Sequence, residues 1–507
     1  MIISIPLLSP IVNCNPYFVN RTSLIVLRTS LIVLLLLSFA VSAQDHAGLQ
    51  KVNALLEEYK NDKDLKPASY SFCVLNAKTG KVLCEYKSTI GLTPASTLKV
   101  LTTGAALGTL GNGFRYETKI QYTGTWDSTK GIIEGNLVIK GSGDPGLNSQ
   151  YFKKKEDTLE IADTWAGVLK EKGIKKITGN IIGDASCFDD QIPANWIWSD
   201  MGNYFGAGAC GLSYSDNKYC IYYKTGAAGE KAQVLKVVPA VKNINLISEV
   251  KAGGNDDNAF IYGAPFQNER KVTGTVPPNQ AAYEVEGSIP DPAAFCAQAL
   301  YDACVEKGIE IKGSAKSTYT PAEKGKTIYI HKSPALEKLV YYTNLKSNNH
   351  YAESFLKTLA CKKAGYGTTS AGCDAVLNYW KGRGVDVDGL FMNDGSGLSR
   401  SNAISTLQQA SILAKIYRDS SIYKSFNASL PVAGQSGSLA GLCKGTFAEK
   451  NMRAKSGYIT RARGYCGFVK TKKGEDLSFS VLFNNYNCSP SEVKAKIEKL
   501  LELMADL

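Results

Sequence analysis

The spacing of apolar residues divides the first quarter of the chain into helical and strand-like stretches. Apolar positions recur at helical spacing over residues 49–59, which predicts an amphipathic helix. A hairpin is expected over residues 70–86. Pro94 then begins a segment, residues 95–110, that is apolar on nearly every face, as expected of a helix buried in a domain centre.

The pattern changes after this buried segment. Residues 116–122 and 131–140 alternate like strands, and short turns become frequent. Two helix-to-strand units recur, and the second begins with Asp291 as N-cap and Pro292 at the first helical position. Helix-capped, strand-rich material of this kind predicts an inserted α+β region over about 117–332.

Long helical patterns return from Ser333 onward and end in a strand pair, residues 465–470 and 477–483. A capping box of Ser489 and Glu492 begins the last helix, which has one apolar side. We expect that side to pack against the terminal sheet. Anchoring at a membrane surface is the alternative.

The first 43 residues have the pattern of a secretory signal. They hold two arginines, no acidic residue, an apolar run over residues 31–37 and the small-residue end Val41-Ser42-Ala43. We therefore expect cleavage near Ala43 and export to the periplasm or the cell-wall space. A membrane anchor is the alternative, although the run is shorter than the roughly 20 residues that span a bilayer.

The 507-residue chain is 44% hydrophobic and 21% charged, as in globular proteins of two or three domains. Removal of residues 1–43 lowers the formal net charge from +12 to +10. This charge favours peripheral association with cell-wall polymers or lipid headgroups. Nucleic acid is not an expected partner, because the sequence has no zinc finger, no aromatic-plus-basic strand pair and no dense basic run.

Twelve of the 13 cysteines lie after the signal, and an even number in an exported protein is compatible with disulfides. A hairpin centred between Lys78 and Thr79 would place Cys73 directly opposite Cys84. Buried free thiols are an equal alternative. Because no C-x-x-C pair occurs, a zinc site is not expected, and no other metal or cofactor is implied.

The catalytic chemistry available to this chain is restricted by its three histidines. Neither H-E-x-x-H nor G-x-S-x-G occurs, which disfavours zinc peptidases and α/β-hydrolases. Lysine can act as the base when burial or a neighbouring cation disfavours its charged form. Ser96 in the first turn after Pro94, with Lys99 one turn on, would place a hydroxyl beside such a lysine.

These residues resemble the first signature of the active-site serine penicillin-recognising enzymes, whose motifs run S-x-x-K, S-x-N and K-T/S-G. Ser347-Asn348-Asn349 and Lys455-Ser456-Gly457 follow in order. Residues 143–147, 348–353, 393–400 and 430–434 narrow the resemblance to D-alanyl-D-alanine carboxypeptidase/endopeptidases of the penicillin-binding protein 4 type. The resemblance covers essentially the whole mature chain.

The resemblance implies an α/β (α+β) fold, a transpeptidase domain like that of penicillin-binding proteins and β-lactamases, with an antiparallel sheet covered by helices. Residues 44–116 and 333–507 would form this domain around the insert. The insert, residues 117–332, would hold a nested subdomain near 147–235.

The resemblance also implies a serine-type D-Ala-D-Ala carboxypeptidase and DD-endopeptidase that acts on peptidoglycan stem peptides through an acyl-enzyme on Ser96. The β-lactams would be covalent inhibitors. Lys99 would be the base, and Ser347 would relay a proton to the leaving amine. Asn349 would bind the substrate amide.

The third motif would recognise the end of the substrate and complete the oxyanion hole. Lys455 would neutralise the terminal carboxylate, and Ser456 would hydrogen-bond it. Gly457 completes the motif, and the backbone N–H groups of Ser96 and Tyr458 would form the oxyanion hole. In relatives an acidic residue of the insert contacts the substrate's diamino-acid side chain, a role open here to Asp189 or Asp190.

Similar triplets occur elsewhere, at Ser215-Asp216-Asn217, Lys224-Thr225-Gly226 and Lys78-Thr79-Gly80. Lys78 lies in a predicted turn, and the other two are only nine residues apart. The family separates its motifs by roughly a hundred residues, which favours Ser347 and Lys455. A β-lactamase and a non-catalytic penicillin-binding scaffold are the alternative functions. The sequence leaves open the balance of carboxypeptidase and endopeptidase activity, the third stem-peptide residue and the oligomeric state.

Overall fold

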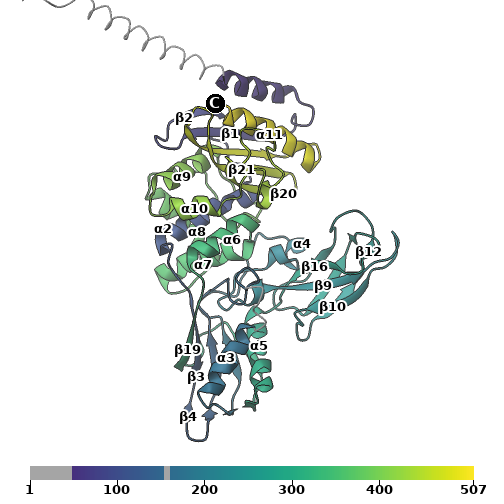
Figure 1. The fold of residues 1–507 in the computed structure, drawn as a ribbon, viewed down its shortest axis with the longest axis vertical. Coiled ribbons are helices and arrows are strands. Elements are labelled where there is room, and N and C mark those ends of the chain that lie inside the picture. The colour runs from purple at the N-terminus through teal and green to yellow at the C-terminus, as the bar shows by residue number, and fades with distance from the viewer. Residues whose placement is uncertain (1–47, 154–159) are drawn as a thin grey trace, which may run out of the picture.

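The two ends of the described chain build one antiparallel sheet at the same end of the molecule (Figure 1). This computed structural model describes residues 48–153 and 160–507, so the predicted signal over residues 1–43 lies outside them. The strands lie in the order β2-β1-β22-β21-β20. Their bounds are β1 Ser69–Asn76, β2 Val82–Tyr86, β20 Arg453–Ile459, β21 Ala462–Lys470 and β22 Asp476–Asn484.

Helices cover both faces of this sheet. On one face lie the helix over residues 48–61 and α11 (Pro490–Ala505), whose Val493, Ile497 and Leu500 are completely buried. The apolar side of the last helix therefore packs on the sheet, as expected. Among the described residues, no helix is both long enough and apolar enough to cross a membrane.

The other face of the sheet packs on a group of six helices. Buried side chains of this group and of β21 and β22 form one hydrophobic cluster. The helices are α2 (Lys99–Leu110), α6 (Leu336–Lys346), α7 (Asn349–Ala364), α8 (Thr369–Lys381), α9 (Thr406–Arg418) and α10 (Tyr423–Ser429).

The insert leaves and rejoins the rest of the chain through two adjacent strands. β3 (Glu117–Tyr122) and β19 (Lys326–Lys332) pair antiparallel, with Glu117 opposite Lys332. They lie in a sheet of order β18-β8-β6-β3-β19, which α3 and α5 cover. The other bounds are β6 Leu137–Lys140, β8 Ile181–Asp184, β18 Ala315–Thr318, α3 Ile161–Glu171 and α5 Pro292–Glu306.

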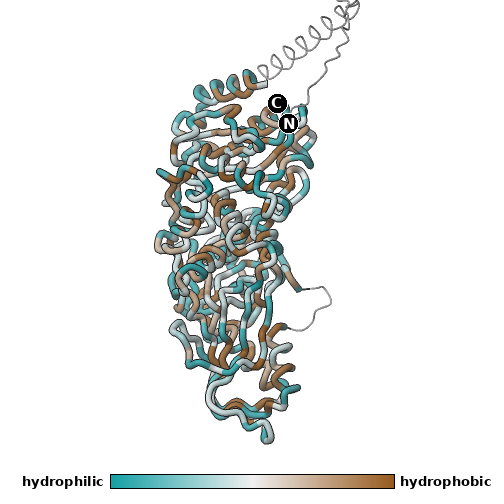
Figure 2. The backbone as a smooth tube through the Cα atoms, turned by 90° about the vertical axis from the view of Figure 1, so that its left-hand side faces the viewer, coloured by the Kyte–Doolittle hydropathy of each residue, from teal (hydrophilic) through white to brown (hydrophobic). Residues whose placement is uncertain are grey.

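A second group of strands in the insert forms a separate lobe, beside the first in Figure 1. Its own hydrophobic cluster runs from Tyr219 to Ile289. The strands are β9 Lys218–Lys224, β10 Gln233–Val238, β11 Asn245–Ser248, β12 Lys251–Ala252, β13 Phe260–Tyr262, β14 Glu269–Thr273, β15 Thr275–Val276 and β16 Tyr283–Ser288. Figure 2 shows hydrophobic segments along the whole length of the molecule, in keeping with several small cores.

Most predicted elements are present, and two predictions are wrong in detail. The predicted strand over residues 131–140 is two strands, β5 (Ile132–Glu134) and β6, which belong to different sheets. Gly135 separates them with φ +152°, a conformation that side-chain-bearing residues rarely adopt. β5 belongs to a small sheet with β4 (Thr125–Asp127), β7 (Lys176–Ile177) and β17 (Glu310–Ile311).

The expected position of Cys73 directly opposite Cys84 is also wrong. In the β1–β2 hairpin Cys73 lies opposite Glu85, and Cys84 lies opposite Val74. Neighbouring strand positions point to opposite faces, so Cys73 packs beside α9 while Cys84 lies in the cluster under α11. All twelve cysteines of the described residues are free thiols.

Candidate active site

Ser96 lies in a short turn directly before a buried helix. The predicted helix over residues 95–110 is divided into a 3-10 turn, η1 (Ala95–Leu98), and the α-helix α2, which begins at Lys99. Ala95 has φ +47°, an uncommon backbone conformation for a residue with a side chain. The turn is held by Thr97, whose N–H and hydroxyl both donate to the Pro94 carbonyl.

The Lys99 amine contacts the Ser96 hydroxyl and two carbonyl oxygens. Nζ lies 2.9 Å from Ser96 Oγ, 2.6 Å from Asn349 Oδ1 and 2.7 Å from the Ser396 carbonyl oxygen. The two carbonyl oxygens can only accept hydrogen bonds, so a neutral amine gives them its two hydrogens. Its lone pair then faces the Ser96 hydroxyl, in position to take the proton.

The surroundings of Lys99 favour this neutral form. Its side chain is completely buried, and burial lowers its pKa well below the usual value. The Lys455 ammonium lowers this pKa further, while Asp394 and Glu353 raise it. Burial and the second cation outweigh the two acids, so Lys99 can act as a base near neutral pH.

Ser347 and Lys455 come together although they are far apart in the sequence. Ser347 ends α6 in the left-handed conformation, with φ +57°, and Asn348 caps α7 through the Tyr351 N–H. Lys455 lies on β20, and its Nζ is 2.9 Å from Ser347 Oγ and 2.8 Å from the Ser456 carbonyl oxygen. Burial lowers the pKa of Lys455 to about 7. A substrate carboxylate would stabilise its charged form.

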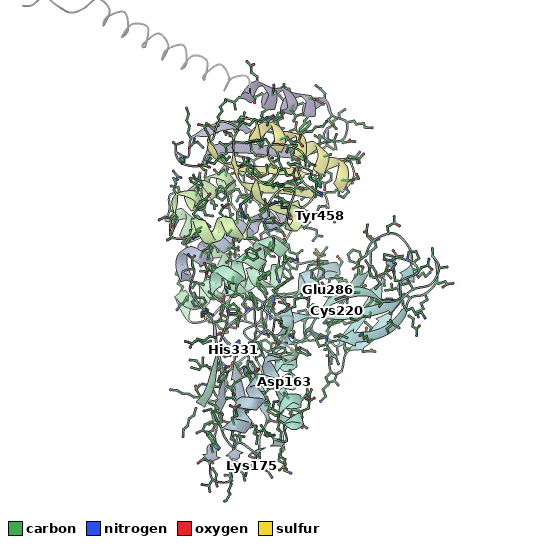
Figure 3. The ribbon with its side chains drawn as sticks, in the orientation of Figure 1. Asp163, Lys175, Cys220, Glu286, His331 and Tyr458 are labelled. Atoms are coloured by element: carbon green, nitrogen blue, oxygen red, sulfur yellow. The ribbon has the colours of Figure 1, made fainter. Side chains whose placement is uncertain are left out.

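Strand β20 packs directly against the Ser96 turn. A side chain at Gly457 would meet the Pro94 carbonyl oxygen at 2.5 Å and the Ser96 nitrogen at 3.1 Å, so only glycine permits this approach. The Ser456 hydroxyl bonds Ser438 Oγ at 2.6 Å. Tyr458 is 51% exposed and lies at the edge of β20 that faces the insert (Figure 3).

Glu353 and Asp394 organise the loop that presents the Ser396 carbonyl to Lys99. The buried Glu353 carboxylate accepts the N–H groups of Gly395 and Ser396, and Asp394 accepts those of Gly397 and Ser399. Burial, with a smaller effect of Asp394, raises the pKa of Glu353 to about 7. Sequence reasoning assigned no role to these acids, although both lie in the motifs that carry the resemblance.

The similar triplets at 215–217 and 224–226 lie in the insert, and Asp216 and Asn217 contact Tyr351 and His350 of α7 instead of Ser96 or Lys99. Ser215-Asp216-Asn217 forms the turn η3, and Lys224 ends strand β9 with its side chain exposed. Lys78 lies in the β1–β2 turn and forms an exposed ion pair with Asp476. Among these motifs, only Ser347 and Lys455 lie close to the Ser96 and Lys99 pair.

Of the two candidate acids in the insert, Asp189 is already paired. It accepts a hydrogen bond from the almost completely buried Lys357 Nζ of α7, which also donates to the Gln191 carbonyl. Asp190 accepts a hydrogen bond from Gln191. Asp189 thus fixes the insert to α7, which disfavours it as a contact for the substrate amine.

Two groups of side chains within the described residues have the composition of a metal site. They are Cys220 with Glu284 and Glu286, and Cys443 with Glu498 and Glu502. Glu286 forms an ion pair with Lys218, and Glu498 accepts the Cys443 N–H. These partners account for one carboxylate in each group, and nothing connects either group to Ser96.

Comparisons with known proteins show what this chain is similar to. The model of the D-Ala-D-Ala carboxypeptidase 3 (S13) family matches residues 52–507. A D-alanyl-D-alanine carboxypeptidase of Actinomadura sp. (strain R39) is 27% identical over 86% of this chain and 81% of its own length. The D-alanyl-D-alanine carboxypeptidase DacB of Haemophilus influenzae is 24% identical over 87% of this chain and 90% of its own length.

A solved structure has the same fold. It is that of penicillin binding protein 4 (dacB) from Haemophilus influenzae, with a TM-score of 0.75 and 22% identity. The match covers 89% of this chain and 99% of the other. The expected penicillin-binding-protein-like fold is therefore confirmed.

Proposed function

Because this chain belongs to the D-Ala-D-Ala carboxypeptidase 3 (S13) family, we propose that it cleaves peptidoglycan stem peptides through an acyl-enzyme on Ser96. It is a serine-type D-Ala-D-Ala carboxypeptidase, a hydrolase of the same class as its relatives. The observation that carries the assignment of Ser96 is the orientation of the Lys99 amine. Two acceptor-only partners turn its lone pair toward the Ser96 hydroxyl, 2.9 Å away.

In the proposed reaction Ser96 Oγ attacks the carbonyl carbon of the D-Ala-D-Ala amide while Lys99 takes the hydroxyl proton. Developing negative charge on the oxygen is stabilised by the Ser96 and Tyr458 N–H groups. Ser347 passes a proton to the leaving amine, and the C–N bond breaks to release D-alanine. Water then attacks the ester and regenerates the Ser96 hydroxyl.

Binding of the substrate end falls to the third motif. Lys455 neutralises the terminal carboxylate, Ser456 hydrogen-bonds it, and Gly457 lets β20 approach the Ser96 turn. Asn349 binds the substrate amide. The β-lactams, whose amide and carboxylate resemble those of D-Ala-D-Ala, acylate the same serine.

Covalent labelling tests this proposal. A fluorescent penicillin followed by peptide mapping should mark the peptide that contains Ser96, and Ser96→Ala should remove the label and the release of D-alanine. A label on another serine would show that the nucleophile is wrong. Slow loss of the label distinguishes a peptidase from a β-lactamase, which would release it rapidly.

We further propose endopeptidase activity on cross-linked stem peptides in the periplasm or cell-wall space. Digestion of purified sacculi and mass analysis of the products would reveal cross-link cleavage, and release of D-alanine alone would exclude it. Secretion with cleavage near Ala43 is tested by determining the N-terminus of the mature protein. A product that keeps residues 1–43 would exclude it.

The chain enters and leaves the insert through the adjacent strands β3 and β19, which supports a division into two parts. We propose that residues 44–116 and 333–507 form the peptidase domain and that residues 117–332 form the insert, with a nested subdomain near residues 147–235. Peripheral association with the wall follows from the net charge. It predicts that sacculus binding weakens as salt shortens the Debye length, which is roughly 10 Å at 0.1 M. Salt-independent binding would exclude an electrostatic cause.

A further inference from the structure

Three consecutive residues at the start of α7 are each bound by the insert. Asn349 Nδ2 donates to the Phe205 carbonyl at 2.8 Å, and Tyr351 OH donates to Asp216 Oδ1 at 3.0 Å. Between them His350 Nε2 lies 2.8 Å from Ser213 Oγ. This turn of helix follows Ser347 directly, so the insert contacts the backbone segment that carries two proposed site residues.

The Phe205 carbonyl determines how the Asn349 amide faces Lys99. A carbonyl oxygen only accepts, so the NH₂ group of the Asn349 amide must point toward Phe205. The amide oxygen is then left on the other side, 2.6 Å from Lys99 Nζ. A rotated amide would place two oxygens together and turn N–H donors toward Lys99. The insert thus helps to orient the Lys99 lone pair.

His350 fixes the position of this helical turn. Its imidazole is 2% exposed, and Nε2 lies within 3.1 Å of Asn217 Nδ2, an atom that only donates. Burial lowers the pKa of His350 to about 3, so the ring is neutral and Nε2 can accept from Asn217 or Ser213. Leaving a buried polar atom without its partner is unfavourable, so the contacts of His350 with Ser213 and Asn217 hold this turn of α7 against the insert.

We propose that the insert segment over residues 205–217 is a positioning element of the catalytic centre, which orients the Asn349 amide and hence the Lys99 amine. Ser213 and Asn217 are positioning residues, since they act through His350 and contact no reacting atom. The inference rests on the proposed role of Lys99 as the base. Other contacts, such as Asn195 Nδ2 with Asn393 Oδ1, hold the insert in place without reaching the start of α7.

The test is the pH dependence of Ser96 acylation by a fluorescent penicillin in the full chain. Ser213→Ala should lower the acylation rate about ten- to a hundredfold, as small misplacements of a reacting group do. It should also move the acid limb of the profile to lower pH, because Lys99 loses an acceptor that favours its charged form. The other charged groups around Lys99, namely Lys455, Asp394 and Glu353, are unchanged by this variant.

Matched variants separate positioning from general weakening of the insert. Ser213→Thr keeps the hydroxyl, so it should have the wild-type acylation rate and the wild-type position of the acid limb of the pH profile. Thr225→Ala removes a buried hydroxyl that bonds only within the insert, to the Pro277 carbonyl and the Gln280 N–H, and should move neither. Tyr351→Phe removes the contacts of this hydroxyl with Asp216 and with Ser149, without a change in the shape of the ring. It decides the question if Ser213→Ala does not fold.

Each outcome has one meaning. A lower acylation rate of Ser213→Ala, together with an acid limb at lower pH, supports the proposal. A wild-type profile for Ser213→Ala, or a lower rate with an unshifted limb, overturns it. If the wild-type protein is not labelled on Ser96, the proposed function itself is wrong, and the inference fails with it.

Discussion

Ser347 and Ser215 begin nearly identical triplets, one at the end of α6 and one in the insert. Ser347 bonds the buried ammonium of Lys455, whereas Ser215 Oγ accepts from the Asn148 amide. Lys455 is completely buried, whereas Lys224 is exposed at the end of a strand. The same letters therefore describe a group of reactive side chains in one place and a turn that docks two parts of the chain in the other.

The difference lies in what surrounds each triplet. Burial and a second cation change the protonation of Lys99, and a neighbouring helix end supplies the Ser347 hydroxyl. The polar side chains of the insert triplet form hydrogen bonds with other residues, including Tyr351 and His350. A motif becomes a catalytic site only where its side chains stay available to a substrate and their charges are altered by burial.

The largest difference is expected between Ser347→Ala and Ser215→Ala. Ser347→Ala should lower turnover and acylation by about 10²- to 10⁴-fold, because a positioned proton donor is lost. Ser215→Ala should leave both within about twofold, because the Ser215 hydroxyl accepts from Asn148 within the insert, whereas the contacts of this segment with α7 come from its neighbours. Steady-state kinetics with a D-Ala-D-Ala peptide would measure this. The reverse result would place the reaction in the insert.

The next largest effect is expected when Lys455 and Lys224 are each replaced by alanine. Lys455→Ala should lower kcat/KM about 10- to 100-fold for peptides with a free terminal carboxylate, since a charge-assisted hydrogen bond contributes about 1.5–3 kcal/mol. Amidated peptides should be affected much less. Lys224→Ala is the matched control and should behave as wild type toward both. Equal losses for acid and amide would contradict the carboxylate role.

The pH dependence of kcat/KM tests the role of the buried Lys455 directly. Burial lowers the pKa of Lys455 to about 7, so the free protein loses this charge as the pH rises through that value. We expect kcat/KM for carboxylate substrates to fall above about pH 7, by up to tenfold per pH unit. Lys455→Arg, whose side chain stays charged, should lack this alkaline limb even at a reduced rate. A limb that persists in that variant would belong to another group.

The smallest effect concerns stability. Burial lowers the pKa of His350 to about 3, against about 6.5 in an unfolded chain, so the folded state resists its protonation. Its contribution is fully present above about pH 6.5 and declines as the pH falls toward 3. Between pH 6.5 and pH 5 the loss is about 2 kcal/mol. Chemical denaturation at both pH values would measure it, and His350→Gln should show a smaller difference.

Local signals in the sequence predicted much of the fold. The capping box at Ser489, the N-cap at Asp291 and the terminal strand pair are present as expected. Register was not predictable, because a bulge between Val74 and Leu75 changes which residues of the hairpin face each other. No periodicity signals such an irregularity.

The candidate site was predictable as a set of motifs but not as a geometry. The short spacing from Ser96 to Lys99 indicated that these two meet, since one turn of helix places them together. The acceptors of the Lys99 amine could not be derived in the same way. The Ser396 carbonyl comes from a loop almost 300 residues away, and its position depends on the buried carboxylate of Glu353.

The order of strands in the sheet also determines when the site can assemble during synthesis of the chain. β22 lies between β1 and β21, so the strand that carries Lys455 joins the rest of the sheet only through residues near the end of the chain. A ribosome makes Ser96 long before residues 453–484 exist. A nascent chain therefore carries Ser96 and Lys99 before it has Lys455. The site can therefore assemble only after residues 453–484 have been made.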